Sequence, residues 1–164
     1  MPPGMAILPI LKEPNEILRQ IAKPVSLDDL AKPEIQNVLD DMVHTMHVAK
    51  GIGLAAPQVG ISKRLIVVLM GEKPRIFINP EIISSAFRKV ESEEGCLSVP
   101  GVFGIVKRTR GVEVKALDRN GKCVTVKTNG LPAIIFQHEI DHLNGTLFID
   151  KIERLTEHHE TETL

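Results

Sequence analysis

His138 and His142 are the two side chains in this 164-residue chain whose type and spacing best suit metal chemistry. Residues four apart on a helix lie on the same face, one turn from each other. Both imidazoles can therefore bind one cation, and Glu139 beside them can move protons on a water at that cation. The alternative is a helix with two surface histidines, which the HExxH pattern alone does not exclude.

The residues around these histidines predict that their helix is buried. Pro132 suits its first turn, and Gly145 after Asn144 suits its end. Nearly every face between them carries an apolar side chain: Ala133, Ile134, Ile135, Phe136, Ile140 and Leu143. Burying imidazoles is costly without a partner, and a cation is such a partner. A catalytic site needs a third protein ligand, for which Cys96, in what we expect to be an exposed turn, an acidic residue or another histidine are candidates.

The elements that must position this helix are predicted to be helices followed by short strands. Pro14 and Pro24 bracket a short helix, and an amphipathic helix opens at Pro33 and ends at Gly51. Apolar runs and alternation predict strands at 64–70, 75–79, 86–92, 112–117 and 123–127. Asn120-Gly121 marks a hairpin turn. We expect an α+β fold in which mostly antiparallel short strands pack around the buried C-terminal helix with the HExxH motif.

Length and composition predict a single domain over 1–164, with residues 1–6 as a flexible extension and 153–164 as a polar tail that includes His158-His159. The net charge of −1 and the absence of Trp and Tyr give no reason to expect direct nucleic-acid binding. No signal peptide or apolar run of membrane-spanning length is recognisable, so no membrane association is expected. Two cysteines without a CxxC pair suit a reducing compartment. The expected location is the cytoplasm, or an organelle if the source is eukaryotic.

Three other side chains of reactive type are predicted to be structural. His44 and His47 lack a partner at ligand spacing. Cys123 is placed on the strand face opposite Val124 and Val126, which predicts a half-buried thiol.

Three segments resemble, in order, the signature motifs of the peptide deformylase family: GIGLAAPQVG at 51–60, EEGCLSVP at 93–100 and QHEIDHLNG at 137–145. The segment LKEPNEILRQIAKPV is similar to that family's N-terminal segment, and the resemblance runs from about residue 7 to 150. It implies a metal-dependent hydrolase that removes the formyl group from N-formylmethionine at the N-terminus of newly made peptides and releases formate. The implied partners are N-formylmethionyl peptides and nascent chains at the ribosome.

The resemblance also implies a role for each residue of the catalytic centre. Cys96, His138 and His142 would hold one divalent metal per chain, iron(II) in vivo, with zinc, nickel or cobalt as substitutes. Glu139 would be general base and then general acid on the metal-bound water. The oxyanion donors would be the Gln58 amide and the Leu97 backbone N–H.

Around that centre, Glu94 and Arg108 would support the ligands. Gly53 would lie against the substrate backbone. The methionine side chain would meet an apolar wall, for which a plain core role is the alternative, formed by Ile52, Leu131, Ile134 and Ile135. Phe103 stands where many relatives carry Arg, and Ser92 where many are apolar, so contacts with the peptide are expected to differ there.

Two other classes of protein also use such histidines. A zinc endopeptidase shares HExxH, but a cysteine is an unusual third ligand for a protease, and the other two motifs would be unexplained. A non-catalytic protein with a structural metal site needs four protein ligands, and no fourth candidate is apparent. The retained Glu139 and Gln58 also disfavour a catalytically inactive relative.

Overall fold

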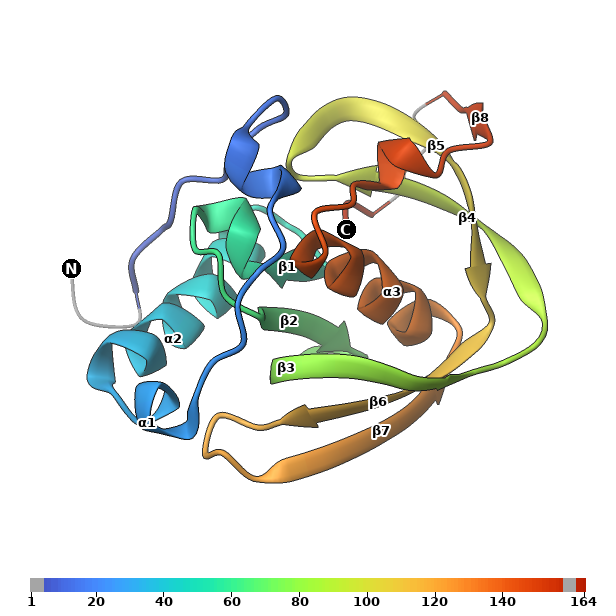
Figure 1. Ribbon diagram of the computed structural model, residues 1–164. Coiled ribbons are helices and arrows are strands. Elements are labelled where there is room, and N and C mark those ends of the chain that lie inside the picture. Colours follow the sequence, from blue (N-terminus) through green and yellow to red (C-terminus); the bar gives the residue numbers. More distant parts are fainter. Residues whose placement is uncertain (1–4, 158–161) are drawn as a thin grey trace.

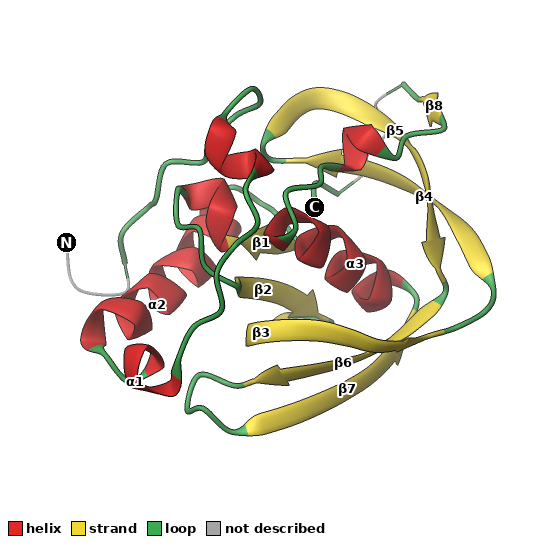
Figure 2. Ribbon diagram, in the orientation of Figure 1, coloured by secondary structure: helices red, strands yellow, loops and turns green. Residues whose placement is uncertain are grey.

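Two antiparallel sheets and three α-helices make up the part of the chain that this computed structural model describes, residues 5–157 and 162–164. The helices are α1 (Leu27–Leu30), α2 (Pro33–Val48) and α3 (Leu131–Leu143), with short 3-10 turns at Glu16–Arg19, Ala56–Val59 and Phe148–Asp150. The strands are β1 (Gly53–Ala55), β2 (Leu65–Met70), β3 (Lys73–Ser85), β4 (Lys89–Cys96), β5 (Val99–Thr109), β6 (Gly111–Leu117), β7 (Cys123–Asn129) and β8 (Arg154–Leu155). Figures 1 and 2 show α3 between the larger sheet and the β4–β5 hairpin. The predicted α+β class is confirmed.

The larger sheet, in the order β1-β2-β3-β6-β7, is buried on both faces at β2. Alternate side chains of a strand point to opposite faces. Ile66 and Val68 therefore pack in one cluster with α3, while Leu65 and Val67 pack in another with α2. This explains why 64–70 reads as a continuous apolar run rather than as an alternating one.

The predicted helix that opens at Pro33 is α2, and Pro33 stands in its first turn. Its apolar stripe is buried at Ile35, Leu39, Met42 and Met46 against the outer face of the sheet. His44 is partly buried and His47 is exposed, so both lie at the surface or partly buried positions that were predicted.

The helix α3 is buried along most of its length, and its ends are where the sequence predicted them. Pro132 lies in the first turn, and the chain leaves the helix through Asn144 and Gly145, whose φ is +73°. A side chain at Gly145 would also overlap the backbone carbonyl of Arg19. Both the positive φ and the lack of space therefore favour glycine at this position. Arg64 donates to the Leu143 carbonyl at 3.0 Å and so satisfies a backbone acceptor at the helix end.

The smaller sheet, β4-β5-β8, departs from the sequence prediction. The strand expected at 86–92 begins at Lys89 and continues to Cys96, and β5, which was not predicted, pairs with it from Val99 onwards. The strand expected at 75–79 extends over Lys73–Ser85. Glycines and prolines at 95, 100, 101 and 104 obscured this hairpin in the sequence, because such residues normally mark turns.

Smaller differences concern three other segments. The hairpin at Asn120-Gly121 is confirmed, with Gly121 at φ +81°, but Cys123 is exposed rather than half-buried. The short helix between Pro14 and Pro24 is a single 3-10 turn. Residues 1–4 of the predicted N-terminal extension lie outside the described residues, as do His158 and His159.

The segment predicted to be a polar tail has more structure than its composition suggested. Arg154–Leu155 form β8 against β5, and Leu164 is only 3% exposed. Leu164 packs in the hydrophobic cluster with Ile52 and Ile135, which the mostly polar composition of 153–164 does not indicate. The expectation of a solvated tail is therefore wrong for Leu164.

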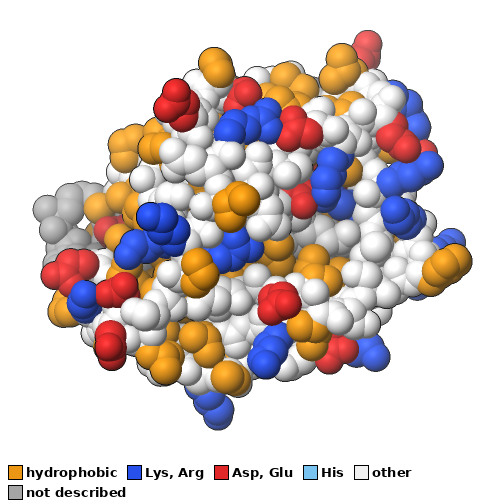
Figure 3. Space-filling view, in the orientation of Figure 1, with side chains coloured by type: hydrophobic (Ala, Val, Ile, Leu, Met, Phe, Trp, Pro, Cys, Tyr) orange, Lys and Arg blue, Asp and Glu red, His pale blue; other side chains and the backbone are white. Residues whose placement is uncertain are grey.

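Charged side chains of both signs are interspersed on the face of the molecule seen in Figure 3, as expected for a net charge of −1. Among the described residues, none of the helices has the length and apolar character needed to cross a bilayer.

Candidate metal centre

The helix α3 and the end of β4 bring three ligand-type side chains together in the interior. One donor atom each from Cys96, His138 and His142 lies within 4.8 Å of the others, and Cys96 Sγ is 3.3 Å from His142 Nε2. Metal–ligand bonds of about 2.0–2.3 Å imply ligand separations of roughly 3.3–3.8 Å in a tetrahedral site. The expectation that Cys96 sits in an exposed turn is wrong, because the β4–β5 pairing buries it to 2% exposure.

The His138 nitrogen that would face a cation has no hydrogen-bond partner among the described residues. His138 Nδ1 lies 3.0 Å from Glu94 Oε1, and its Nε2 is buried with no hydrogen bond. An ionised glutamate accepts a hydrogen bond, so Nδ1 is the protonated nitrogen and Nε2 keeps its lone pair. A buried acceptor without a donor is costly, and a cation would remove that cost. The three residues therefore fit a divalent metal.

The protonation of these ligands in the metal-free protein follows from their burial. Burial, and then the negative charge of Glu139, raise the pKa of the Cys96 thiol to about 12. Burial, and then the neighbouring His138, lower the pKa of His142 well below its ordinary value. His142 is therefore a neutral imidazole, the form that binds metals, whereas Cys96 must lose a proton to become a ligand.

Glu139 points into the same interior space from the turn that carries His138. It is fully buried, and neither carboxylate oxygen has a hydrogen-bond partner among the described residues. A side chain at Gly53 would overlap Glu139 Oε1, so the glycine leaves room for this carboxylate. Burial, and then the negative charge of Glu94, hold the pKa of Glu139 well above its ordinary value. A carboxylate with a raised pKa binds a proton more readily than an exposed one does.

Glu94 and Arg108 form a buried ion pair directly behind the histidine. Arg108 donates to both carboxylate oxygens of Glu94, from Nε at 2.8 Å and from Nη2 at 2.7 Å. Burial would raise the pKa of Glu94, but the hydrogen bonds from Arg108 and His138 outweigh it and bring the pKa to about 2. Glu94 is therefore ionised, and its carboxylate lies within hydrogen-bond distance of His138 Nδ1.

The Gln58 side chain is held in one orientation beside the cysteine. Its Oε1 accepts from the Ala55 N–H at 2.9 Å, which directs Nε2 towards Ser98 Oγ at 3.2 Å and Cys96 Sγ at 3.6 Å. The amide nitrogen of Gln58 thus lies within hydrogen-bond distance of Cys96 Sγ in the ligand cluster.

The residues predicted to form the apolar wall do not share one environment. Ile52 and Ile135 are buried in a common cluster, and Ile134 packs against it while partly exposed. Leu131 is 49% exposed at the start of α3. Of the two departures noted in the sequence, Ser92 is buried, and Phe103 packs with its ring against Gly95.

Sequence reasoning missed two side chains that complete this arrangement. Ser98 accepts the hydrogen bond from Gln58, and Asp141 accepts one from Arg108 Nη1 at 2.6 Å. Asp141 stands three residues after His138 on α3, so helical spacing could have indicated it. Nothing in the spacing of Ser98 indicated its partner.

Comparisons with known proteins agree with this geometry. The sequence profile of a family described as polypeptide deformylase matches residues 7–158. A peptide deformylase from Halothermothrix orenii is 51% identical over 155 residues, which cover 93% of this chain and 98% of the relative. The class I type b peptide deformylase from Acinetobacter baumannii, solved with bound Met-Ala-Ser, superposes with a TM-score of 0.86 at 41% identity and covers 90% of this chain and 99% of that one. A peptide deformylase from Synechococcus elongatus in complex with actinonin has a TM-score of 0.84 at 45% identity and covers 90% and 79%.

Proposed function

Since the chain belongs to the polypeptide deformylase family, we propose that Glu139 is the residue that moves the proton in its reaction. That reaction is the metal-dependent hydrolysis of the formyl amide of N-formylmethionine at a peptide N-terminus. The role of Glu139 is supported by the position of its carboxylate. This group is buried, has no hydrogen-bond partner among the described residues, and follows His138 directly in the chain.

We assign Cys96, His138 and His142 as the ligands of one divalent cation. When bound, such a cation polarises the substrate carbonyl and lowers the pKa of a water molecule. Glu94 holds the His138 ring in the tautomer that leaves Nε2 free, and Arg108 keeps Glu94 ionised.

Glu139 accepts a proton at one carboxylate oxygen as water attacks the formyl carbon. It then delivers that proton to the amide nitrogen as the C–N bond breaks, which releases formate and a free amino terminus. Burial, and then the charge of Glu94, raise the pKa of Glu139, which makes this carboxylate a stronger base than an exposed glutamate.

The charge that develops on the carbonyl oxygen needs hydrogen-bond donors, which we assign to Gln58 Nε2 and the Leu97 backbone N–H. Gln58 is fixed by Ala55 and Ser98, so its donor needs no rearrangement during the reaction. We place the substrate backbone against Gly53 and the methionine side chain against Ile52, Ile134 and Ile135, with Leu131 at the exposed rim.

Iron(II) is our assignment for the cation in vivo, with zinc, nickel or cobalt able to replace it. The one-sulfur, two-nitrogen donor set accepts each of these ions. We place the protein in the cytoplasm, where the free thiols of Cys96 and Cys123 are maintained. Its substrates there are nascent chains at the ribosome. Anaerobic purification followed by metal analysis, and co-sedimentation with ribosomes, test these assignments.

The test of the proposed role is formate release from formyl-Met-Ala-Ser by anaerobically loaded protein. Glu139→Gln should bind one metal ion per chain and lower kcat by about 10²–10⁴-fold, the usual contribution of a general acid–base residue. Glu34→Gln, which changes an exposed glutamate on α2, is the matched control and should retain wild-type rates. Full activity of metal-loaded Glu139→Gln would exclude this residue as the proton carrier, and hydrolysis of acetyl-Met-Ala-Ser at a similar rate would contradict a formyl-specific site.

A further inference from the structure

The segment Thr163–Leu164 lies inside the candidate site, far in sequence from the residues that it contacts. Ile52 N–H donates to the Thr163 carbonyl at 3.1 Å, and Leu164 N–H donates to the Gly95 carbonyl at 3.2 Å. Leu97 N–H donates to the Leu164 carbonyl at 3.3 Å. Two extended residues are thus bonded on one side to the approach to β1 and on the other to the end of β4, next to Cys96.

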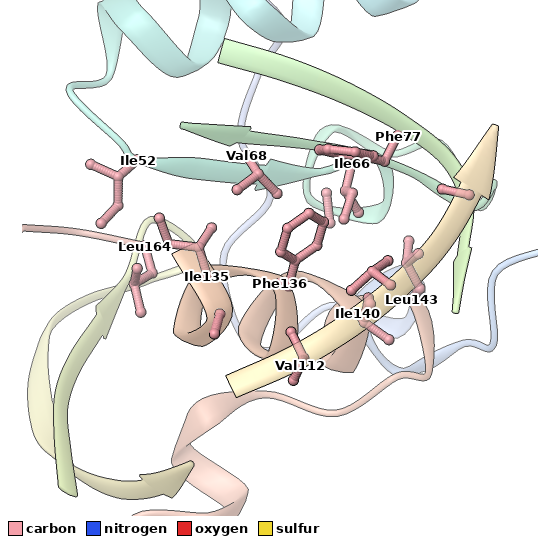
Figure 4. Close-up of a cluster of buried hydrophobic side chains, with 14 of the residues drawn as sticks. Ile52, Ile66, Val68, Phe77, Val112, Ile135, Phe136, Ile140, Leu143 and Leu164 are labelled. Carbon is pink, nitrogen blue, oxygen red and sulfur yellow. The ribbon is translucent and has the colours of Figure 1, made fainter. Parts of the chain in front are cut away.

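The side chain of Leu164 completes the core next to the metal-binding helix. It is 3% exposed and belongs to the same buried cluster as Ile52 and Ile135. Figure 4 shows Leu164 beside Ile135 of α3, below Ile52. These isoleucines are residues to which we assigned the methionine side chain of the substrate, and leucine and methionine are similar in volume and polarity.

The backbone contacts of Leu164 also coincide with a group assigned to the reaction. The Leu97 N–H, assigned as a donor to the substrate oxyanion, is directed at the Leu164 carbonyl. One N–H group and one apolar pocket cannot serve both occupants at once. Binding of Leu164 and binding of a formylmethionyl peptide are therefore mutually exclusive.

We propose that the segment 162–164 is an intramolecular competitor, which fills the methionine pocket until a formylated peptide displaces it. This inference rests on the proposed function, because it identifies the pocket through the substrate. The covalent tether gives the segment a high effective concentration at the pocket, so a weak contact is sufficient for substantial occupancy. Leu164 is the one apolar side chain in this segment, so its burial supplies the main attraction.

Competition of this kind raises KM and leaves kcat unchanged, because the segment is absent from the complex that reacts. Leu164→Asp should therefore lower KM for formyl-Met-Ala-Ser by about tenfold, the lower end of what burial of one leucine contributes. The matched control is Leu155→Asp, which places the same charge on a side chain that is 74% exposed in β8 and should leave KM and kcat at wild-type values. An unchanged or higher KM in Leu164→Asp would overturn the proposal.

A readout independent of catalysis separates this inference from the proposed function. In the absence of substrate, the amide protons of Ile52 and Leu97 should exchange faster in Leu164→Asp than in the wild type, since each loses its acceptor. Equal exchange in the two proteins would show that the segment is not bound in solution and would overturn the proposal. If neither protein released formate, the proposed function would fail, and the exchange rates alone would still decide whether the segment occupies the pocket.

Discussion

Cys96 and Cys123 are the same side chain in opposite surroundings, and the surroundings decide their chemistry. Cys96 is buried beside two histidines and Glu139, whereas Cys123 is exposed at the start of β7. Without a cation, burial keeps Cys96 protonated, with a pKa of about 12. A bound metal reverses this preference, because a coordinated thiol is deprotonated.

Metal binding should therefore release a proton from Cys96. Below pH 12 the free thiol is protonated, so raising the pH favours the metal-bound thiolate and strengthens binding. Titration calorimetry with zinc in buffers of different ionisation enthalpy measures how many protons are released for each ion bound. Cys96→Ser should release one proton fewer per zinc ion than the wild type. Cys123→Ser is the internal control and should leave the count unchanged. An identical count in Cys96→Ser would remove the Cys96 thiol from the ligand set.

At the scale of elements, β4 has two glutamates that are both paired with arginine but differ in burial. Glu94 is buried against Arg108, behind His138, while Glu91 meets Arg154 at the surface. Removing one partner of a buried ion pair strongly destabilises a protein, because water cannot solvate the charge that remains. An exposed ion pair contributes little to the free energy of unfolding. The strand thus allows a buried and an exposed glutamate–arginine pair to be compared.

Glu94→Gln should lower the free energy of unfolding by about 3 kcal/mol at neutral pH, while Glu91→Gln should cause no measurable change. The pH dependence has a defined sign. The folded pKa of Glu94, about 2, lies below the ordinary value of 4.5, so its stabilisation is present above pH 4.5 and is lost as the pH falls towards 2. Denaturant titrations of metal-free protein from pH 5 to pH 2 should show this loss in the wild type and not in Glu94→Gln. Parallel pH curves for the two proteins would disprove the assignment.

At the scale of the whole molecule, the metal site joins two parts of the fold that hydrogen bonds already link, among them Glu94 to His138 and Arg108 to Asp141. Cys96 belongs to the smaller sheet, and both histidines belong to α3, which packs on the larger sheet. A cation bound to all three would tie β4 to α3. Because it would bind the folded protein preferentially, it should also stabilise the chain.

Chelation should therefore lower the thermal stability of the loaded protein. At free zinc 100 times above the dissociation constant, linkage predicts a stabilisation of about 2.7 kcal/mol, and Tm should rise further with zinc concentration. Scanning calorimetry with zinc and with a chelator measures the difference. In Cys96→Ser, the Tm measured with zinc and the Tm measured with a chelator should be nearly equal. A wild-type Tm that does not respond to zinc would argue against a site shared by the sheet and the helix.

The sequence by itself determined the metal-binding helix, its ends and the α+β class. These features depend on local rules: helical periodicity places His138 and His142 on one face, and Pro132 and Gly145 mark the ends. Only the tertiary structure decided the burial of Cys96, the Ser98 contact of Gln58 and the place of Leu164 beside Ile135. Each of these depends on segments far apart in the chain packing together, and neither residue spacing nor composition specifies such a contact.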